Sequence, residues 1–349
     1  MSKSLKIGDL EVKIPVVQGG MGVGISLSGL AGNVSACGGL GVISTAQIGW
    51  REPDFYEKPF EANFRAIEKE IKKARELAKG GVLGVNIMVA TQRYEEYVKS
   101  AVKAGIDIVI SGAGLPIDLP KYVEGSKTKI APIVSSLKSL TVICRMWERK
   151  YQTAPALVVI EGPKAGGHLG FSREELETVT DEAYDDVIVS IIEKVKEYSE
   201  KFSKKIPVVV AGGIYERKDM EHVMKLGADG VQMGTRFVTT KECDADEAYK
   251  QSYIKAKKED IKIVQSPVGM PGRAILNPFL EKVKTEKCKI KHCYQCIVTC
   301  DKKTIPYCIT EALVNAAEGR VDEGLLFCGE NAYRADKIET VAEIMEEFR

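Results

Sequence analysis

A histidine enclosed by glycines is the residue in this sequence best suited to chemistry. His168 lies in the stretch KAGGHLG (164–170), directly after the apolar run 156–162. Its own loop supplies no bulky side chain to pack the imidazole, and imidazole titrates close to neutral pH. The other two histidines, His222 and His292, lie on an expected helix and among lysines and cysteines, where structural or solvated roles are commoner. We therefore expect His168 to have a functional role.

Two late apolar runs that end in glycine form a second chemical feature. They read VVVAGGI (208–214) and VQMGTRF (231–237). Glycine lets a backbone approach a phosphate closely, and a threonine hydroxyl adds a donor. The alternative is that these glycines only relieve tight turns after strands. The residues expected at a phosphate are Ala211, Gly212, Gly213, Gly234 and Thr235.

A cluster of cysteines is the third feature. Five of the nine cysteines lie between Cys288 and Cys308. The spacing Cys293-x2-Cys296-x3-Cys300, completed by Cys308 or Cys288, gives the four thiolates that zinc or an iron–sulfur cluster takes. Flanking lysines would favour the thiolate form. The alternative is that these cysteines pack as small apolar side chains in a buried lobe. The ligand set predicted for a metal is Cys293, Cys296, Cys300 and Cys308.

The elements that must position these residues are eight short apolar runs. Most end in glycine or a small polar residue, and they are apolar almost throughout, which is typical of strands buried on both faces of a parallel sheet. Segments with helical spacing of apolar residues, such as 63–80 and 181–203, lie between them. The runs are 14–21, 39–45, 82–88, 106–111, 129–136, 156–162, 206–213 and 230–237.

This alternation predicts an α/β fold, a (β/α)8 TIM barrel. Eight strand–helix units in about 240 residues fit such a barrel, for which roughly 250 residues is typical. A doubly wound open sheet is the alternative, but the glycines after the first run do not have the G-x-G-x-x-G spacing of its dinucleotide site. Barrel active sites lie at the carboxyl ends of the strands. Further residues expected there are Gly19, Gly20, Met21, Asn86, Ser135 and Glu161.

The character of the chain changes after the eighth run. Residues 264–280 contain three prolines and are expected to be loop-like, and residues 309–319 and 335–348 have helical patterns. We predict a barrel over residues 1–240 and a helical, cysteine-rich lobe over residues 241–349 that packs on it.

Composition excludes several classes of protein. With 44% hydrophobic and 28% charged residues the chain is an ordinary globular one, and a net charge of +1 gives no electrostatic footprint for nucleic acid or an anionic membrane. No apolar run approaches the roughly 18 residues of a spanning helix, and the start has no secretory signal. We expect a cytoplasmic protein with reduced thiols that acts on a small molecule. A homodimer is left open.

The motifs together resemble a known family. Five segments resemble, in this order, those of nitronate monooxygenases, formerly called 2-nitropropane dioxygenases. The segments are PVVQGGMGVGIS, VLGVNIM, VVIEGPKAGGHLG, PVVVAGGI and GVQMGTRF. The pattern is also similar to that of flavin-dependent enoyl-acyl-carrier-protein reductases. It covers roughly residues 10–280. The cysteine stretch lies outside it and is similar to the iron–sulfur segment of dienoyl-CoA reductases.

The resemblance implies an FMN-binding barrel with His168 as the catalytic histidine. The flavin phosphate would be held by Gly212, Gly213, Gly234 and Thr235, and the ring would lie near Gly19, Gly20, Met21 and Asn86. The loop Ala165-Gly166-Gly167-His168 would run beside the flavin.

The expected activity is oxidation of alkyl nitronates with dioxygen. One alternative is an enoyl-acyl-carrier-protein reductase that uses NAD(P)H as co-substrate. A second is a flavin electron-transfer or regulatory module without turnover, which has no need for an acid or base such as His168.

Overall fold

A closed ring of eight parallel strands forms the centre of the protein. The computed structural model describes residues 4–349. The ring closes where the first strand of the barrel, Val16–Gln18, meets the segment before Gly41–Ser44. There the Gln18 amide donates to the Leu40 carbonyl and the Leu40 amide donates to the Val16 carbonyl, both at 2.9 Å. This closure confirms the (β/α)8 barrel and excludes the open sheet. In spatial order the strands are β3 (Val16–Gln18), β11 (Gly230–Met233), β10 (Val208–Ala211), β8 (Val158–Glu161), β7 (Lys129–Val134), β6 (Ile108–Gly112), β5 (Leu83–Met88) and β4 (Gly41–Ser44).

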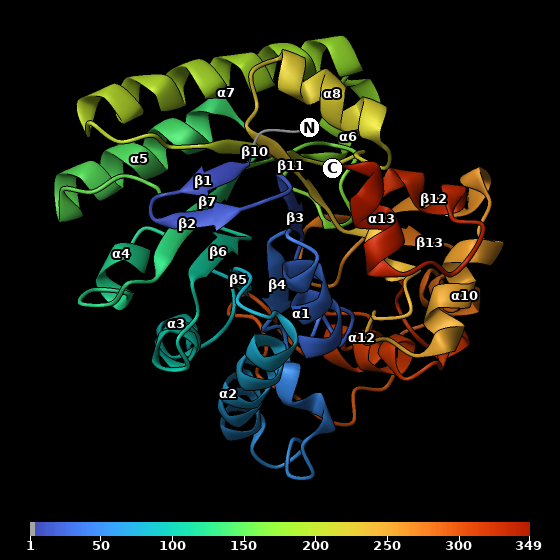
Figure 1. The fold of residues 1–349 in the computed structure, drawn as a ribbon. Coiled ribbons are helices and arrows are strands. Elements are labelled where there is room, and N and C mark those ends of the chain that lie inside the picture. Colours follow the sequence, from blue (N-terminus) through green and yellow to red (C-terminus); the bar gives the residue numbers. More distant parts are fainter. Residues whose placement is uncertain (1–3) are drawn as a thin grey trace.

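Helices surround the ring and cover its outer face (Figure 1). Their apolar stripes pack against the outward residues of the strands, which is why the strands read as unbroken apolar runs. A short 3₁₀ segment, Ile48–Arg51, follows β4, and α6 (Arg173–Thr178) follows the histidine loop. The surrounding helices are α1 (Ser28–Ala36), α2 (Pro59–Leu77), α3 (Tyr94–Lys103), α4 (Leu119–Tyr122), α5 (Leu137–Tyr151), α7 (Asp181–Lys201), α8 (Arg217–Lys225) and α9 (Thr235–Val238).

An amino-terminal hairpin that the sequence patterns did not reveal packs against the inside of the ring. Strands β1 (Leu5–Ile7) and β2 (Leu10–Val12) pair antiparallel around a turn at Gly8, whose φ is +62°. Leu5, Ile7 and Val12 are buried in one cluster with inward residues of the barrel strands. Three-residue strands are too short to show an alternating pattern, so they gave no signal.

The carboxyl-terminal lobe gathers on one side of the barrel (Figure 1, orange to red). Its regular helices are α10 (Glu247–Lys255), α11 (Pro278–Val283), α12 (Ile309–Ala317) and α13 (Val341–Glu347), with 3₁₀ turns at Lys258–Asp260, Val321–Glu323 and Glu330–Arg334. We propose the division at residue 240 because the last barrel helix, α9, ends at Val238.

The lobe is not wholly helical, and the prediction that residues 264–280 form a loop is wrong in part. Strands β12 (Ile261–Gln265) and β13 (Pro271–Ile275) form a hairpin, and β9 (Gly167–His168) joins it as a third strand. Pro271 is tolerated because it is the first residue of its strand. Gly269, with a φ of +91°, lies in the turn. Pro267 and Pro271 therefore bracket the turn of the hairpin, and Pro278 begins α11.

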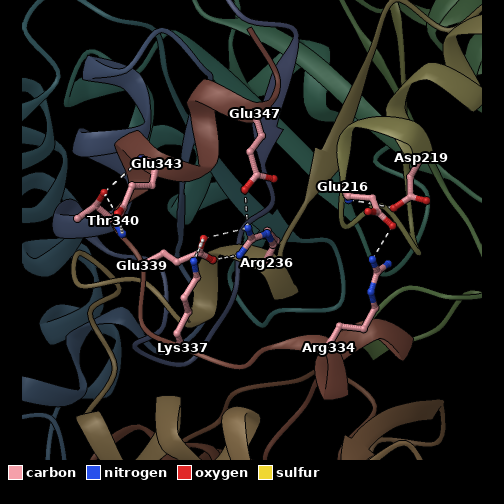
Figure 2. Close-up of polar contacts among 9 residues, drawn as sticks. All are labelled: Glu216, Asp219, Arg236, Arg334, Lys337, Glu339, Thr340, Glu343 and Glu347. Carbon is pink, nitrogen blue, oxygen red and sulfur yellow. Dashed lines mark hydrogen bonds and ion pairs between the residues drawn. The ribbon is translucent and has the colours of Figure 1, made fainter.

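A buried arginine ties the end of the chain to the barrel (Figure 2). Arg236, which follows β11, forms a two-pronged ion pair with Glu339, and its Nη2 lies 2.9 Å from Oε1 of Glu347 on α13. Nearby, Nη2 of Arg334 lies 2.5 Å from Oε1 of Glu216. These ion pairs of Arg236 hold the lobe on the barrel.

Candidate active site

One cavity of about 440 Å³ lies where the strand ends meet the lobe. It collects every catalytic and cofactor-binding residue that the sequence predicts, from all parts of the ring. The residues are Gly19, Gly20, Met21, Asn86, Ser135, Glu161, Ala165, Gly166, Gly167, His168, Ala211, Gly212, Gly213, Gly234 and Thr235. Their individual roles remain predictions, but their grouping is what the barrel topology requires.

The glycines after β10 and β11 form a narrow backbone cradle. Gly212 and Gly213 have φ values of +96° and +84°, which other residues rarely adopt. A Cβ at Gly212 would lie 2.9 Å from the Gly162 carbonyl oxygen, so a side chain would collide with backbone. The amide of Gly213 has no acceptor among the described residues. A backbone exposed in this way fits a phosphate group.

The lobe supports this cradle from outside. The Asn331 side-chain amide donates to the Gly213 carbonyl at 2.7 Å. The Gly329 amide donates to the Thr235 hydroxyl oxygen at 2.9 Å, which leaves the hydroxyl proton of Thr235 available to a ligand. The backbone cradle is therefore supported by contacts from the lobe.

Glycines also flatten the adjoining wall, after β3, the strand that pairs with β11. A Cβ at Gly20 would lie 2.3 Å from Cβ of Asn86, so the end of β3 approaches the end of β5 as closely as backbone allows. The Met21 amide donates to Ser26 Oγ at 2.8 Å, which fixes the following turn. A wall without side chains at Gly19 and Gly20 fits the planar ring of a flavin.

His168 lies at the edge of the three-stranded sheet and faces the cavity. His168 pairs with Gly272 of β13 in this sheet, and the Leu169 amide donates to the Pro271 carbonyl at 2.9 Å. The imidazole Nε2 lies 2.7 Å from the Ser266 hydroxyl, and the ring meets Phe327 edge-on with centroids 5.0 Å apart. Nδ1 has no protein partner within residues 4–349, so it is free to contact a ligand.

Burial keeps His168 neutral. Desolvation lowers the pKa of its imidazole to about 4, because few polar groups surround the ring to stabilise its charged form. A neutral imidazole at pH 7 can accept a proton or donate a neutral hydrogen bond.

Arg273 of β13 fixes the loop that carries this histidine. Its Nη1 donates to the Pro163 carbonyl at 2.8 Å and to the Ala165 carbonyl. Phe327 is fixed in turn by two hydroxyls, those of Tyr249 and Tyr253, which donate to its carbonyl at 3.2 and 2.6 Å. The glycine–histidine loop is thus held by the lobe and not by its own packing.

Glu161 is the acidic group at the end of β8. Burial raises the pKa of its carboxyl to about 7, and no described side chain forms a hydrogen bond or ion pair with that carboxyl. The Tyr184 hydroxyl instead donates to the backbone carbonyls of Ser135 and Glu161 at 3.2 and 3.0 Å. Burial therefore favours the protonated form of this carboxyl.

The cysteine cluster does not form the predicted metal site. Within residues 4–349, no three histidine, cysteine or acidic side chains are grouped so as to hold a metal ion, and all the cysteines are free. Cys293 is exposed, Cys296 lines the cavity, and Cys308 is the N-cap residue of α12, where its side chain makes no capping hydrogen bond. The thiols are near enough to raise one another's pKa, but they are not grouped as the ligands of one metal ion.

The expectation that flanking lysines favour thiolates is also wrong for the half-buried members of this cluster. Burial is the largest influence on Cys296, Cys300 and Cys308, and it raises the pKa of each thiol, to about 11 for Cys308. The lysine side chains of this stretch are exposed to solvent, which screens their charge.

Sequence reasoning missed Ser266, Arg273 and Phe327. The first two lie in the stretch SPVGMPGRA (266–274), which the sequence predicts to be loop-like. The stretch did carry one signal of a hairpin. A serine and an arginine flank a turn rich in proline and glycine, and such a turn commonly connects the two strands of a hairpin. Nothing in the sequence around Phe327 indicates that it would reach His168.

A sequence model described as nitronate monooxygenase matches residues 3–349. The chain belongs to the nitronate monooxygenase family. The resemblance inferred from the motifs is thereby confirmed, and the match includes the lobe and its cysteine stretch, which the motifs left out. Among the described residues, no helix combines the length and apolar character needed to cross a membrane.

Curated relatives carry the family's name at low identity. A probable nitronate monooxygenase of Staphylococcus saprophyticus is 26% identical over 299 residues, with 79% of each chain covered. One from Staphylococcus aureus is 25% identical over 305 residues, with 78% of each chain covered.

Solved structures confirm the barrel. FabK from Thermotoga maritima has a TM-score of 0.71 and 28% identity, and covers 97% of this chain and 92% of its own. A nitroalkane oxidase from Streptomyces ansochromogenes has a TM-score of 0.71 over 96% of this chain and 94% of its own. Its identity of 19% supports the shared fold alone.

Proposed function

We propose that the protein binds FMN and oxidises alkyl nitronates with dioxygen. The observation that carries the proposal is one cavity that holds both a backbone phosphate cradle and a neutral imidazole, in a chain of the nitronate monooxygenase family. When bound, FMN supplies the electron transfer that amino-acid side chains cannot perform.

The residues present fit such a cofactor. Gly212, Gly213, Gly234 and Thr235 would hold the phosphate through amides and a hydroxyl. The side-chain-free wall at Gly19 and Gly20, with Asn86 beside it, would lie against the ring. Both assignments use surfaces that a Cβ would fill.

His168 would bind and orient the substrate through Nδ1. Toward a nitronate, a neutral imidazole that carries its proton on Nδ1 donates a hydrogen bond to a nitro oxygen; toward a neutral nitroalkane, an unprotonated nitrogen accepts the proton on the α carbon. In the overall reaction the carbon–nitrogen bond breaks, the carbon gains an oxygen from dioxygen as a carbonyl, and nitrogen leaves as nitrite. Two nitronates and one dioxygen balance two carbonyl compounds and two nitrite ions.

A second candidate function is reduction of enoyl thioesters with NAD(P)H. The likeness to FabK over nearly the whole chain favours it. The two functions differ in what reduces the flavin. Anaerobic mixing with a nitronate and, separately, with NADH distinguishes them: the proposal expects the nitronate to reduce the flavin, and reduction by NADH alone would favour the second function.

A further inference from the structure

A second cavity, separate from the candidate active site, lies at the amino ends of the barrel strands. Its volume is about 470 Å³. Lys129, the first residue of β7, lines this cavity, whereas Ser135, just past the other end of β7, lines the candidate active site. The helices beside it, α4 and α5, are on the side of the barrel away from the carboxyl-terminal lobe (Figure 1). A ligand here would not compete with a substrate.

Lysines dominate the charged groups of this cavity. Its described lining holds four lysines and a single acid, Glu124, and it holds no arginine and no histidine. The lysines come from four separate segments of the chain, namely α4, the start of β7, the end of α5 and the loop before β10. They are Lys121, Lys129, Lys150 and Lys204. The fold therefore gathers positive charge that the sequence disperses over more than 80 positions.

Two of the four lysines have carboxylate partners, which lie outside the lining. Nζ of Lys129 is 2.5 Å from Oδ1 of Asp9. Nζ of Lys150 is 3.4 Å from Oδ1 of Asp118, and the same oxygen accepts a hydrogen bond from the Tyr151 hydroxyl at 2.5 Å. Even when these two carboxylates are counted with Glu124, the cations around the cavity outnumber the anions.

The other two lysines have no such partner. Neither Lys121 nor Lys204 forms an ion pair with a carboxylate of residues 4–349, and Nζ of Lys204 donates only to the Ala154 carbonyl, at 2.7 Å. Although Lys204 as a whole is exposed, desolvation of its ammonium, and after that the positive charge of Lys129, lower its pKa. An anion that contacts both ammonium groups would relieve this repulsion.

The kinds of side chain present favour a phosphate group as that anion. A lysine binds phosphate as a compact point charge, whereas planar carboxylates are matched best by the fork of an arginine, which the described lining lacks. The Thr153 hydroxyl has no protein partner among the described residues and can add a donor. Val123 and Ile130 supply apolar surface beside these groups, where an organic part could pack.

We propose that this cavity binds a phosphate dianion between Lys121, Lys129 and Lys204. The inference goes beyond the proposed function and does not depend on it. Inorganic phosphate and the monoester of a small organic molecule carry the same dianionic group, and the cavity has room for either. Each ammonium that contacts the dianion should contribute about tenfold to affinity, the value of one charge-assisted hydrogen bond.

The test titrates the purified protein with inorganic phosphate and, separately, with phenyl phosphate, by isothermal calorimetry at constant ionic strength. We expect saturable binding of phosphate. Tighter binding of phenyl phosphate would uphold the site and identify an organic phosphate as its ligand. Equal or weaker binding would uphold the site for inorganic phosphate. If neither compound binds, the proposal is refuted and the proposed function is untouched.

Variants locate the binding. Lys204→Gln and Lys121→Gln should each weaken phosphate about tenfold. Lys205→Gln is the matched control, since Lys205 is next in the chain, pairs with Asp229 and is not a lining residue. Affinity that is unchanged in both test variants would place the phosphate elsewhere and overturn the proposal.

A measurement on the unaltered chain complements the variants. Acetic anhydride modifies accessible lysines, and peptide mass spectrometry reports each one. Phosphate should protect Lys204 and Lys121 from modification and leave Lys205 as reactive as before, because only the first two would contact the anion. Equal modification of all three lysines with and without phosphate would contradict the site.

Discussion

The hydroxyl of Ser266 lies 2.7 Å from Nε2 of His168, although the two residues are 98 positions apart in the chain. Ser266 is buried, and its oxygen also accepts a weak hydrogen bond from the Val268 amide at 3.4 Å. The hairpin β12–β13 thus holds one nitrogen of the imidazole and turns the other toward the cavity.

Removal of the Ser266 hydroxyl should misplace the imidazole without removing it. We expect Ser266→Ala to lower kcat about three- to tenfold, the value of one hydrogen bond, with FMN affinity unchanged. Ser266→Thr, which keeps the hydroxyl, should recover most of the rate. Equal losses in both variants would show that Ser266 matters for packing and not for its hydrogen bond.

Removal of the imidazole should have a larger effect. General acid–base groups contribute about 10²–10⁴-fold, so His168→Ala should lose activity on that order in nitronate turnover. FMN should remain bound, because the cradle follows β10 and β11 and does not include His168. Turnover within about threefold of the wild type would contradict a catalytic role.

The pH profile should reflect the burial of His168. Because the pKa of its imidazole is lowered to about 4, the neutral form persists far below the usual 6.5. We expect kcat/KM for preformed nitronate to stay level from pH 8 to about 5 and to fall only as pH approaches 4. An acid limb centred at 6.5 that disappears in His168→Gln would show that the imidazole is solvated in the working enzyme.

Glu161 should make the protein less stable as pH rises. Its pKa is raised to about 7 in the folded state, so the folded protein binds more protons than the unfolded chain between about pH 4.5 and 7, and stability falls across that window. Above pH 7 the carboxylate is charged and buried. Glu161→Gln should therefore raise the free energy of unfolding of the FMN-free protein by about 1–3 kcal/mol at pH 8.5 and by little at pH 4.5. Equal effects at both pH values, from denaturant titrations, would contradict this account.

A negative side chain in the cradle should prevent cofactor binding. Gly213→Asp adds a Cβ at a φ of +84° and places a carboxylate where a phosphate is expected, so FMN affinity should fall on the order of 100-fold or more. Gly80→Asp is the control, because Gly80 has the same φ of +84° with open space around its Cβ. FMN retained by Gly213→Asp would place the phosphate elsewhere.

The barrel and its site were predictable because each strand carries its own signal. The apolar runs placed Gly20 and Gly213 just after strands and Asn86 near the end of one, and barrel closure alone was enough to bring them together. The partners of His168 were not predictable, since Ser266 and Phe327 reach it only through the tertiary pairing of β9 with β13. The arrangement of the cysteines was not predictable, because spacing along a chain does not fix where each thiol points.

The most direct test of the central claim is an anaerobic stopped-flow experiment followed by admission of dioxygen. The purified, FMN-loaded protein is mixed with ethyl nitronate, and the visible absorbance of the flavin is followed. The account predicts rapid loss of that absorbance without any nicotinamide, its recovery with dioxygen, and release of nitrite in step with turnover. Flavin that stays oxidised with every nitronate but is reduced by NADH would contradict it.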